Sequence, residues 1–158
     1  MADVTGFLEQ AGIDFDVLDH AHTESAADEA SALGIGPEAV AKTLVLVASG
    51  GNVRAVLAAS ERIDLQKVAA MLGVGGKKVH LASEDNLAHD YPDFALGAVP
   101  PFGGREDRVL VDKRIAARDS VVVEAGSHER SVRLKATDLV RLTRAQVADI
   151  CSEQQTAG

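Results

Sequence analysis

Two runs of aliphatic residues separated by a short turn constrain the fold more than any other feature of the chain. Residues 43–48 and 53–59 flank the sequence Ser49-Gly50-Gly51-Asn52. Gly and Asn tolerate the positive φ angles of tight hairpin turns, so this pattern predicts two antiparallel strands. The fold must therefore accommodate a β-hairpin in the first half of the chain.

Helix-capping patterns occur on both sides of this hairpin. Ser25 and Asp28 have capping-box-like spacing for a helix through Leu33, and Asp64 precedes an amphipathic helix that Gly73 closes. We expect further helices at residues 4–11, 37–42, 83–88 and 143–151, and further strands at residues 15–18, 77–81, 109–112, 120–124 and 132–134. Strands and helices are interspersed without a regular βαβ repeat. The sequence thus predicts an α+β fold, with a mixed, largely antiparallel sheet and flanking helices.

The length and composition indicate one domain, over residues 1–151, with a frayed tail at residues 152–158. No apolar run approaches the length of a membrane span, and acidic Asp3 follows Met1 instead of a basic leader. The single cysteine, Cys151, excludes an internal disulfide and a cysteine-based metal cluster. We expect Cys151 to be a buried thiol on the last helix. We also expect a cytoplasmic protein with no membrane partner.

The charge distribution is uneven. The net charge of −8 argues against a wholly basic surface for nucleic acid, and we expect no DNA partner. Residues 1–40 contain nine carboxylates and no Lys or Arg, whereas residues 105–144 contain ten basic and seven acidic residues. The region 105–144 could therefore bind the phosphate backbone of a nucleic acid. Judged by charge alone, the alternative of an ordinary solvent-exposed surface with mixed charges is favoured.

Lys42 is the first basic residue of the chain, at the start of the first hairpin strand. A single ammonium group beside a strand of Leu and Val could bind an anion or a carbonyl group. On its own, however, the residue favours a simpler interpretation: the methylene groups of a lysine at the strand edge pack against the protein while its ammonium group reaches water.

The segment Gly97-Ala98-Val99-Pro100-Pro101-Phe102-Gly103-Gly104 is a second unusual feature. Two prolines fix φ and remove backbone donors, while the glycines permit close backbone approach. The segment predicts a stiff wall with exposed carbonyls that could hold a small ligand by main-chain contacts. A sharp chain reversal explains it equally well. It is not a phosphate-binding P-loop, because no Gly-Lys-Ser/Thr follows.

Other polar residues give weaker signals. Ser127 and His128 lie in a predicted turn between strands, but adjacent side chains do not make a nucleophile–base pair, and an ordinary polar turn is the stronger interpretation. The five histidines form no H-x-x-x-H or H-E-x-x-H pattern, so we expect no metal site. His20 and His22 could flank a pocket or face solvent. No pair of carboxylates is singled out by its spacing.

Taken in order, these segments resemble the YbaK/EbsC family of aminoacyl-tRNA deacylases, which is related to the editing domain of bacterial prolyl-tRNA synthetases. The resemblance covers roughly residues 5–150. It rests on His20 before an Ala-rich helix, Ala41-Lys42-Thr43-Leu44-Val45, the segment 97–103, the strand ending at Asp112, Ala125-Gly126-Ser127 and Asp138-Leu139.

The resemblance implies a YbaK-like fold and a freestanding hydrolase. Its substrate would be the ester of mischarged aminoacyl-tRNA, for example cysteinyl- or alanyl-tRNA for proline. Lys42 would be the catalytic residue, holding the terminal adenosine or the ester, and the ribose hydroxyl of the substrate would handle the proton. No cofactor is implied. The residues implied in substrate binding are His20, Gly97, Ala98, Val99, Pro100, Pro101, Phe102, Gly103, Asp112, Gly126, Ser127 and His128.

The 3′ end of aminoacyl-tRNA is the implied partner, with prolyl-tRNA synthetase as a second candidate. Ala98 and Pro100 stand where many relatives have a glycine and a small polar residue, which leaves the edited amino acid open. Two alternatives remain at this point. One is a non-catalytic module of the same fold that binds a tRNA end, a nucleotide or a synthetase. The other is a hydrolase of another small acyl ester or amide.

Overall fold

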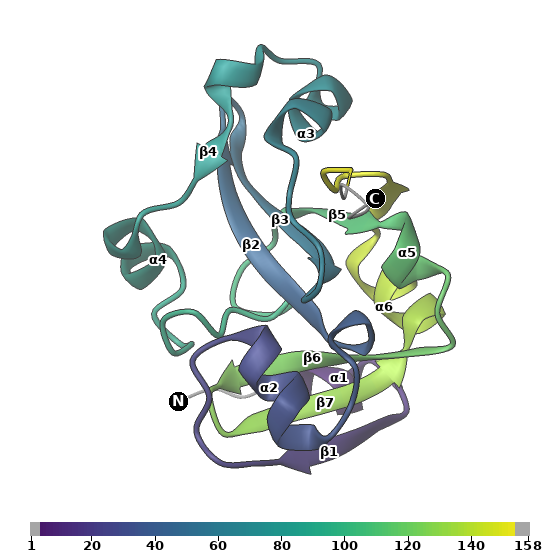
Figure 1. The fold of residues 1–158 in the computed structure, drawn as a ribbon. Coiled ribbons are helices and arrows are strands. Elements are labelled where there is room, and N and C mark those ends of the chain that lie inside the picture. The colour runs from purple at the N-terminus through teal and green to yellow at the C-terminus, as the bar shows by residue number, and fades with distance from the viewer. Residues whose placement is uncertain (1–3, 154–158) are drawn as a thin grey trace.

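The computed structural model describes residues 4–153 and arranges the chain around two β-sheets (Figure 1). The order is α1 (Thr5–Gln10), β1 (Phe15–Asp19), α2 (Ala26–Leu33), η1 (Pro37–Ala39), β2 (Ala41–Ala48), β3 (Gly51–Ala58), α3 (Leu65–Leu72), η2 (Gly76–Lys78), β4 (His80–Leu81), α4 (Glu84–Asp90), β5 (Arg108–Asp112), α5 (Lys113–Ala116), β6 (Ser120–Ser127), β7 (Arg130–Lys135), α6 (Ala136–Thr143) and β8 (Gln146–Ala148). Here η1 and η2 are short 3₁₀ helices.

The predicted hairpin is confirmed as the centre of the larger sheet. Strands β2 and β3 pair antiparallel from Ala41 opposite Ala58 to Ala48 opposite Gly51. The sheet has the order β4-β2-β3-β5-β8, in which β5 runs parallel to both β3 and β8. The smaller sheet, β1-β7-β6, is wholly antiparallel. The α+β class with mixed sheets is thus confirmed, with the strands divided between two sheets.

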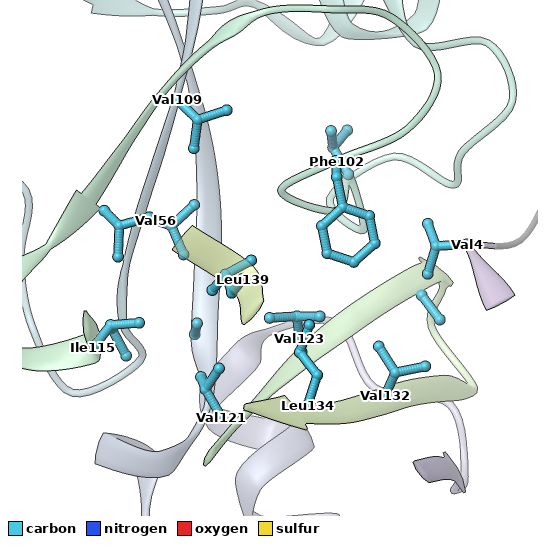
Figure 2. Close-up of a cluster of buried hydrophobic side chains, with 14 of the residues drawn as sticks. Val4, Val56, Phe102, Val109, Ile115, Val121, Val123, Val132, Leu134 and Leu139 are labelled. Atoms are coloured by element: carbon cyan, nitrogen blue, oxygen red, sulfur yellow. The ribbon is translucent and has the colours of Figure 1, made fainter. Parts of the chain in front are cut away.

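The main hydrophobic core lies between the two sheets. Val56 and Val109 of the larger sheet face Val121 and Val123 of β6, and Leu139 of α6 closes the cluster (Figure 2). Each fully buried aliphatic side chain of this kind contributes roughly 1.5–3 kcal/mol. This core therefore fixes how the two sheets sit relative to each other.

The predicted helix caps are confirmed. The Ser25 side chain accepts a hydrogen bond from the backbone N–H of Asp28 at 3.1 Å, and the helix ends at Gly34 with a left-handed φ of 69°. Asp64 accepts from two backbone N–H groups at the start of α3. Ser83 caps α4 in the same way.

The predicted C-terminal helix at residues 143–151 is wrong. The helix of this region, α6, ends at Thr143, because Arg144 adopts a left-handed φ of 53°. Residues 146–148 then form β8 beside β5, and Cys151 pairs antiparallel with Ile63. Cys151 is buried as expected, but on an extended segment. Ser152 donates its N–H to the Arg62 carbonyl, and residues 154–158 of the predicted tail lie outside the described residues.

The predicted strand at residues 77–81 is shorter in the structure. Only His80 and Leu81 pair with β2, and residues 76–78 form the 3₁₀ helix η2. Between residues 4 and 153, no helix has both the length and the apolar character needed to cross a membrane.

Candidate active site

A buried arginine holds the proline-rich loop in place. Arg54 of β3 is only 1% exposed, and its Nε donates to Asp107 at 2.9 Å. Its two terminal nitrogens donate to the backbone carbonyls of Pro100 at 2.9 Å, Gly103 at 2.6 Å and Arg105 at 3.0 Å. The expectation of exposed carbonyls in this loop is therefore wrong for Pro100 and Gly103. Arg54 binds them and makes the loop rigid.

The side chains of the loop are mostly buried. Val99 and Phe102 belong to the core between the sheets, and Ala98, Pro100 and Pro101 are also buried. Gly97 is exposed and has a left-handed φ of 80°. A Cβ atom built on Gly97 would lie 3.5 Å from Cε1 of His128. The loop thus presents the backbone around Gly97, next to His128.

His128 joins the loop to the β6–β7 turn. Its Nε2 lies 2.6 Å from the carbonyl oxygen of Leu96, and because a carbonyl can only accept, Nε2 carries a proton. Its Nδ1 is buried and has no hydrogen-bond partner among the described residues. The Gly126 carbonyl accepts from Ala95 N–H at 2.9 Å. Gly126 itself has a φ of 98°, and Ser127 is partly exposed beside it.

A chain of hydrogen bonds leads from His20 into the protein. Nε2 of His20 lies 2.9 Å from Oγ of Ser131, which in turn donates to Oε2 of Glu29. Nδ1 of His20 lies 2.8 Å from the Ala21 carbonyl and so carries a proton. Ser131 and Glu29 are almost fully buried. His20, at the end of β1, therefore orients a buried carboxylate through one hydroxyl.

Glu124 lies close to this chain. It stands directly opposite Ser131 in the β6–β7 pair, so both side chains leave the same face of the sheet. Burial, with a smaller contribution from the Glu29 carboxylate, raises the pKa of Glu124 to about 8. Burial also raises the pKa of Glu29, against the Ser131 hydrogen bond. We call His20, Glu29, Glu124, His128 and Ser131 the polar cluster.

Lys42 is the second residue of β2, and its electrostatic neighbours are Cys151, Arg62 and Glu61. Successive residues of a strand face opposite ways, so Lys42 shares a face with Val40, which packs on Ala30 and Val122 next to the two glutamates. The Lys42 side chain makes no hydrogen bond or ion pair with residues 4–153. Burial lowers the pKa of its ammonium, and Arg62 acts in the same direction. No direct contact joins Lys42 to the loop or to the polar cluster within the described residues.

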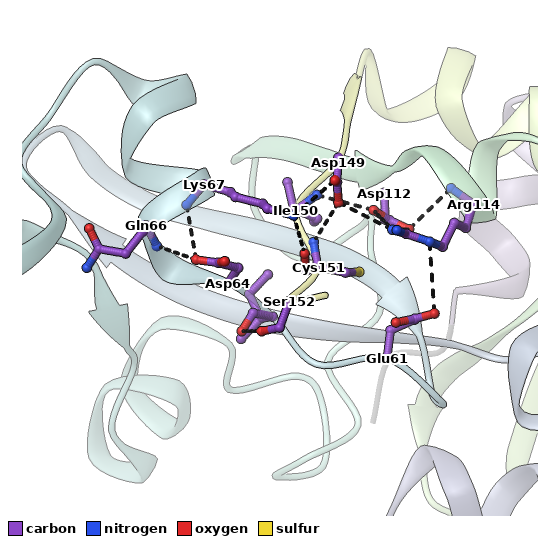
Figure 3. A network of polar contacts seen from close by, with 11 residues as sticks. Glu61, Asp64, Gln66, Lys67, Asp112, Arg114, Asp149, Ile150, Cys151 and Ser152 are labelled. Atoms are coloured by element: carbon purple, nitrogen blue, oxygen red, sulfur yellow. Dashed lines mark hydrogen bonds and ion pairs between the residues drawn. The ribbon is translucent and has the colours of Figure 1, made fainter. Parts of the chain in front are cut away.

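A network of ion pairs and hydrogen bonds joins the segment 149–152 to Lys67 of α3 and to Asp112 and Arg114 (Figure 3). Asp112 is fully buried, caps α5 by accepting from Arg114 N–H, and accepts from Ile150 N–H. Asp149 accepts from Lys67 at 3.0 Å and from Arg114 at 3.3 Å. Asp112, which the resemblance implied in substrate binding, thus positions the backbone here.

Cys151 belongs to this segment and acts electrostatically on Lys42. Burial raises the pKa of the Cys151 thiol to about 12, so it stays protonated and is no nucleophile at neutral pH. Among residues 4–153 there is no group of three or more His, Cys, Asp or Glu side chains placed to hold a metal ion.

The sequence reasoning missed the two glutamates of the polar cluster. A signal existed in both cases. Glu29 lies on the apolar face of α2 that Ala26, Ala30 and Leu33 define, and Glu124 interrupts a strand of buried residues. A carboxylate at such a position is rarely buried without a role.

A cavity of about 530 Å³ lies at the other end of the loop. Arg105, Arg108 and Arg144 line it together with Phe7 and Phe102, whereas neither Lys42 nor His128 does. The cavity therefore belongs to the basic region of residues 105–144, and not to the polar cluster.

Comparison with known proteins gives a consistent result. The aminoacyl-tRNA editing domain family matches over residues 20–142. The multifunctional Ser/Thr-tRNA deacylase ProXp-y of Escherichia coli K12 is 32% identical over 152 residues, which cover 90% of this chain and 87% of that protein. A solved structure assigned as a trans-editing enzyme for prolyl-tRNA synthetase has 27% identity and a TM-score of 0.85, with 95% of each chain covered. A scaffold protein from an epitope-grafting design study has 26% identity and a TM-score of 0.84, with 96% of each chain covered.

These likenesses define an aminoacyl-tRNA deacylase, a hydrolase that acts on the ester bond of charged tRNA. The chain belongs to the aminoacyl-tRNA editing domain family. The resemblance drawn from the sequence is thereby confirmed.

Proposed function

We propose that this deacylase acts in trans on tRNA charged with a small polar amino acid, serine or threonine. The observation that carries the proposal is the exposed Gly97 backbone beside His128, where even a Cβ would reach van der Waals distance of the imidazole ring. Because the loop backbone at Gly97 lies this close to the His128 ring, the space between them suits a small amino acid side chain. The likeness to a Ser/Thr-tRNA deacylase over most of both chains supports the same choice.

Lys42 is the proposed catalytic residue. Water attacks the acyl carbon, the bond from that carbon to the ribose oxygen breaks, and the ribose oxygen takes up a proton that the water loses. Negative charge develops on the ester oxygens during this step, and a half-buried ammonium stabilises it more than a fully hydrated one would. The Glu61 carboxylate raises the pKa of Lys42 against the effect of burial, which supports the charged form that this role requires.

His20, Gly97, Ser127 and His128 are the proposed contacts of the aminoacyl end. The substrate would extend from Lys42 toward Gly97, past Val40, which packs on Ala30 and Val122, close to Glu29 and Glu124 in the chain. Val99 and Phe102 act through the core, and Asp112 through the backbone that it caps.

The body of the tRNA is proposed to contact Arg105, Arg108 and Arg144 around the cavity, where basic side chains flank two phenylalanines. Prolyl-tRNA synthetase is a proposed partner, supported by the structural likeness to a trans-editing enzyme for that synthetase. Charged tRNA is used where proteins are synthesised, so we propose the cytoplasm as the place of action.

A panel of aminoacyl-tRNAs tests the proposal. Seryl-, threonyl-, alanyl- and cysteinyl-tRNA are incubated with the wild type, with Lys42→Ala and with Lys113→Ala, which removes one exposed lysine as a matched control. The wild type and the control should release serine or threonine fastest. Lys42→Ala should lose about 100-fold or more in kcat/KM, equivalent to about 3 kcal/mol, with an unchanged melting temperature. An active Lys42→Ala protein would contradict the catalytic role, and a large fall in melting temperature would make Lys42 structural.

A further inference from the structure

Three buried polar atoms of the polar cluster have no hydrogen-bond partner among the described residues. They are Oε1 of Glu29, Oε2 of Glu124 and Nδ1 of His128. The three residues are 1%, 9% and 9% exposed. Buried polar atoms are almost always paired, because an unpaired one costs about 1–3 kcal/mol. Three such atoms in one cluster therefore indicate a ligand that supplies donors.

The cluster is assembled from four separate elements. Glu29 projects from α2, Glu124 from β6, and His128 from the turn after β6, while His20 follows β1. Ser131 sits between the glutamates: it donates to Glu29 and stands opposite Glu124. Electrostatic interactions link His128 with Glu29 and Glu29 with Glu124, so the residues that carry the three unpartnered atoms belong to one cluster.

Oε1 of Glu29 and Nδ1 of His128 act as hydrogen-bond acceptors, and Oε2 of Glu124 joins them once its carboxyl group has lost its proton. Nε2 of His128 donates to the Leu96 carbonyl, so neutral imidazole leaves a lone pair on Nδ1. Ser131 already occupies the other oxygen of Glu29. The free oxygens of two carboxylates add negative charge to this set. An ammonium group carries a positive charge and three N–H donors, and so matches these acceptors in number and in charge.

We propose that Glu29, Glu124 and His128 form the receptor for the α-ammonium group of the aminoacyl ester. This inference rests on the proposed function, because it assigns one end of the proposed substrate. The position fits that assignment: His128 borders Gly97, so an amino acid lying against the loop places its amino group beside His128. The receptor selects esters with a free amino group over N-blocked ones.

The protonation of the cluster is compatible with this role. Burial holds a proton on Glu124 near neutral pH, since its pKa rises to about 8. An arriving ammonium provides the positive charge that the proton otherwise supplies, and the proton leaves to solvent. The charge of Glu124 is thus balanced by its proton in the absence of substrate and by the ammonium group in its presence.

Blocking the amino group tests the proposal directly. Hydrolysis of seryl-tRNA and of N-acetyl-seryl-tRNA is measured with the wild type, Glu124→Gln and the control Glu9→Gln, which alters an exposed carboxylate. The wild type and the control should prefer the free amine by roughly 10- to 100-fold, the range of one charge-assisted hydrogen bond. Glu124→Gln should lose most of that preference by slowing on seryl-tRNA alone. Equal wild-type rates on both substrates, or an equal loss on both in Glu124→Gln, would overturn the receptor.

A binding measurement keeps the test independent of variant folding. The wild type is titrated with 3′-deoxy-3′-serylamino-adenosine, a stable amide analogue, and with the matching analogue that has a hydroxyl in place of the α-amino group. The amino analogue should bind at least about 10-fold more tightly. Equal affinities would refute the receptor while leaving deacylation intact. If the wild type hydrolyses none of the four aminoacyl-tRNAs of the panel, the proposed function itself fails.

Discussion

Replacing Glu124 by Gln should change how the stability of the protein depends on pH. The pKa of Glu124 rises from 4.5 to about 8 on folding, chiefly through burial. Between these values the folded protein keeps a proton that the unfolded chain has released. The unfolded state therefore binds fewer protons, and the free energy of unfolding must fall as pH rises through this window.

The magnitude follows from the size of the shift. A change of one in the pKa corresponds to about 1.4 kcal/mol. The pKa of Glu124 rises by about 3.5, so its ionisation can lower the free energy of unfolding by at most about 5 kcal/mol, a limit that is reached above pH 8. Only part of this develops at lower pH. Between pH 5 and pH 7 the wild type should lose about 2.5 kcal/mol through this group. Gln has nearly the same shape as a protonated Glu but cannot ionise, so the variant escapes this loss.

Urea unfolding at pH 5, 6, 7 and 8 provides the measurement. Wild type and Glu124→Gln should have similar free energies of unfolding at pH 5, and the variant should become progressively more stable relative to the wild type as pH rises. The exposed-site control Glu9→Gln should run parallel to the wild type. A difference between wild type and Glu124→Gln that stays constant with pH would refute the assignment of a buried, protonated carboxyl.

Three further predictions concern the scaffold and the tRNA. Arg54→Met should lower the free energy of unfolding by about 3–5 kcal/mol, because the buried Asp107 carboxylate keeps only Arg105 and Tyr91 as partners and the loop carbonyls lose their donors. Urea unfolding measures this, and a change below about 1 kcal/mol would contradict the clamp. Asp149→Asn should cost at most about 1 kcal/mol at pH 7, since the ion pair with Lys67 is partly exposed. The pKa of Asp149 is lowered to about 2, so its contribution should vanish as pH falls from about 4 toward 2, and a variant effect that persists at pH 2 would exclude this origin. Binding of tRNA should weaken steeply with salt, and Arg144→Ala should reduce the slope of log K against log salt by about one; an unchanged slope would exclude a phosphate contact.

The sequence predicted those helices and strands whose ends are fixed by contacts between residues close together in the chain. Ser25, Asp64 and Gly73 cap and end their helices through contacts within a few residues, and the sequence alone indicated each of them. The hairpin followed from its glycine-containing turn in the same way. Such patterns are legible because the atoms that satisfy them are neighbours along the chain.

Elements decided by distant partners were not predictable in this way. Residues 146–148 have a helix-like pattern after Thr143, but the exposed backbone of β5 pairs with them as a strand. Tertiary pairing overrides local preference there. Arg54 likewise looks like an ordinary strand residue until the fold brings Asp107 and the loop carbonyls to it.

The same reasoning explains why the site was only partly visible. Gly97, His128 and Lys42 stand out by residue type or by resemblance, whereas Glu29 and Glu124 become a pair only because α2 packs on the β6–β7 strands. They are 95 positions apart in the sequence, as their residue numbers give. No spacing rule along the chain connects residues at such a separation.

The stability of the fold and the chemistry of the site place opposite demands on buried polar groups. Arg54 and Asp107 satisfy every demand of stability: each donor or acceptor that they bury against the loop has a partner. The polar cluster does the reverse, since it keeps three unpartnered atoms at a cost of about 1–3 kcal/mol each. The rigid clamp on one end of the loop allows the other end, at Gly97, to face that cluster without collapsing onto it. A protein selected for stability alone would fill the cluster with apolar side chains, so its retention argues for a ligand that completes it.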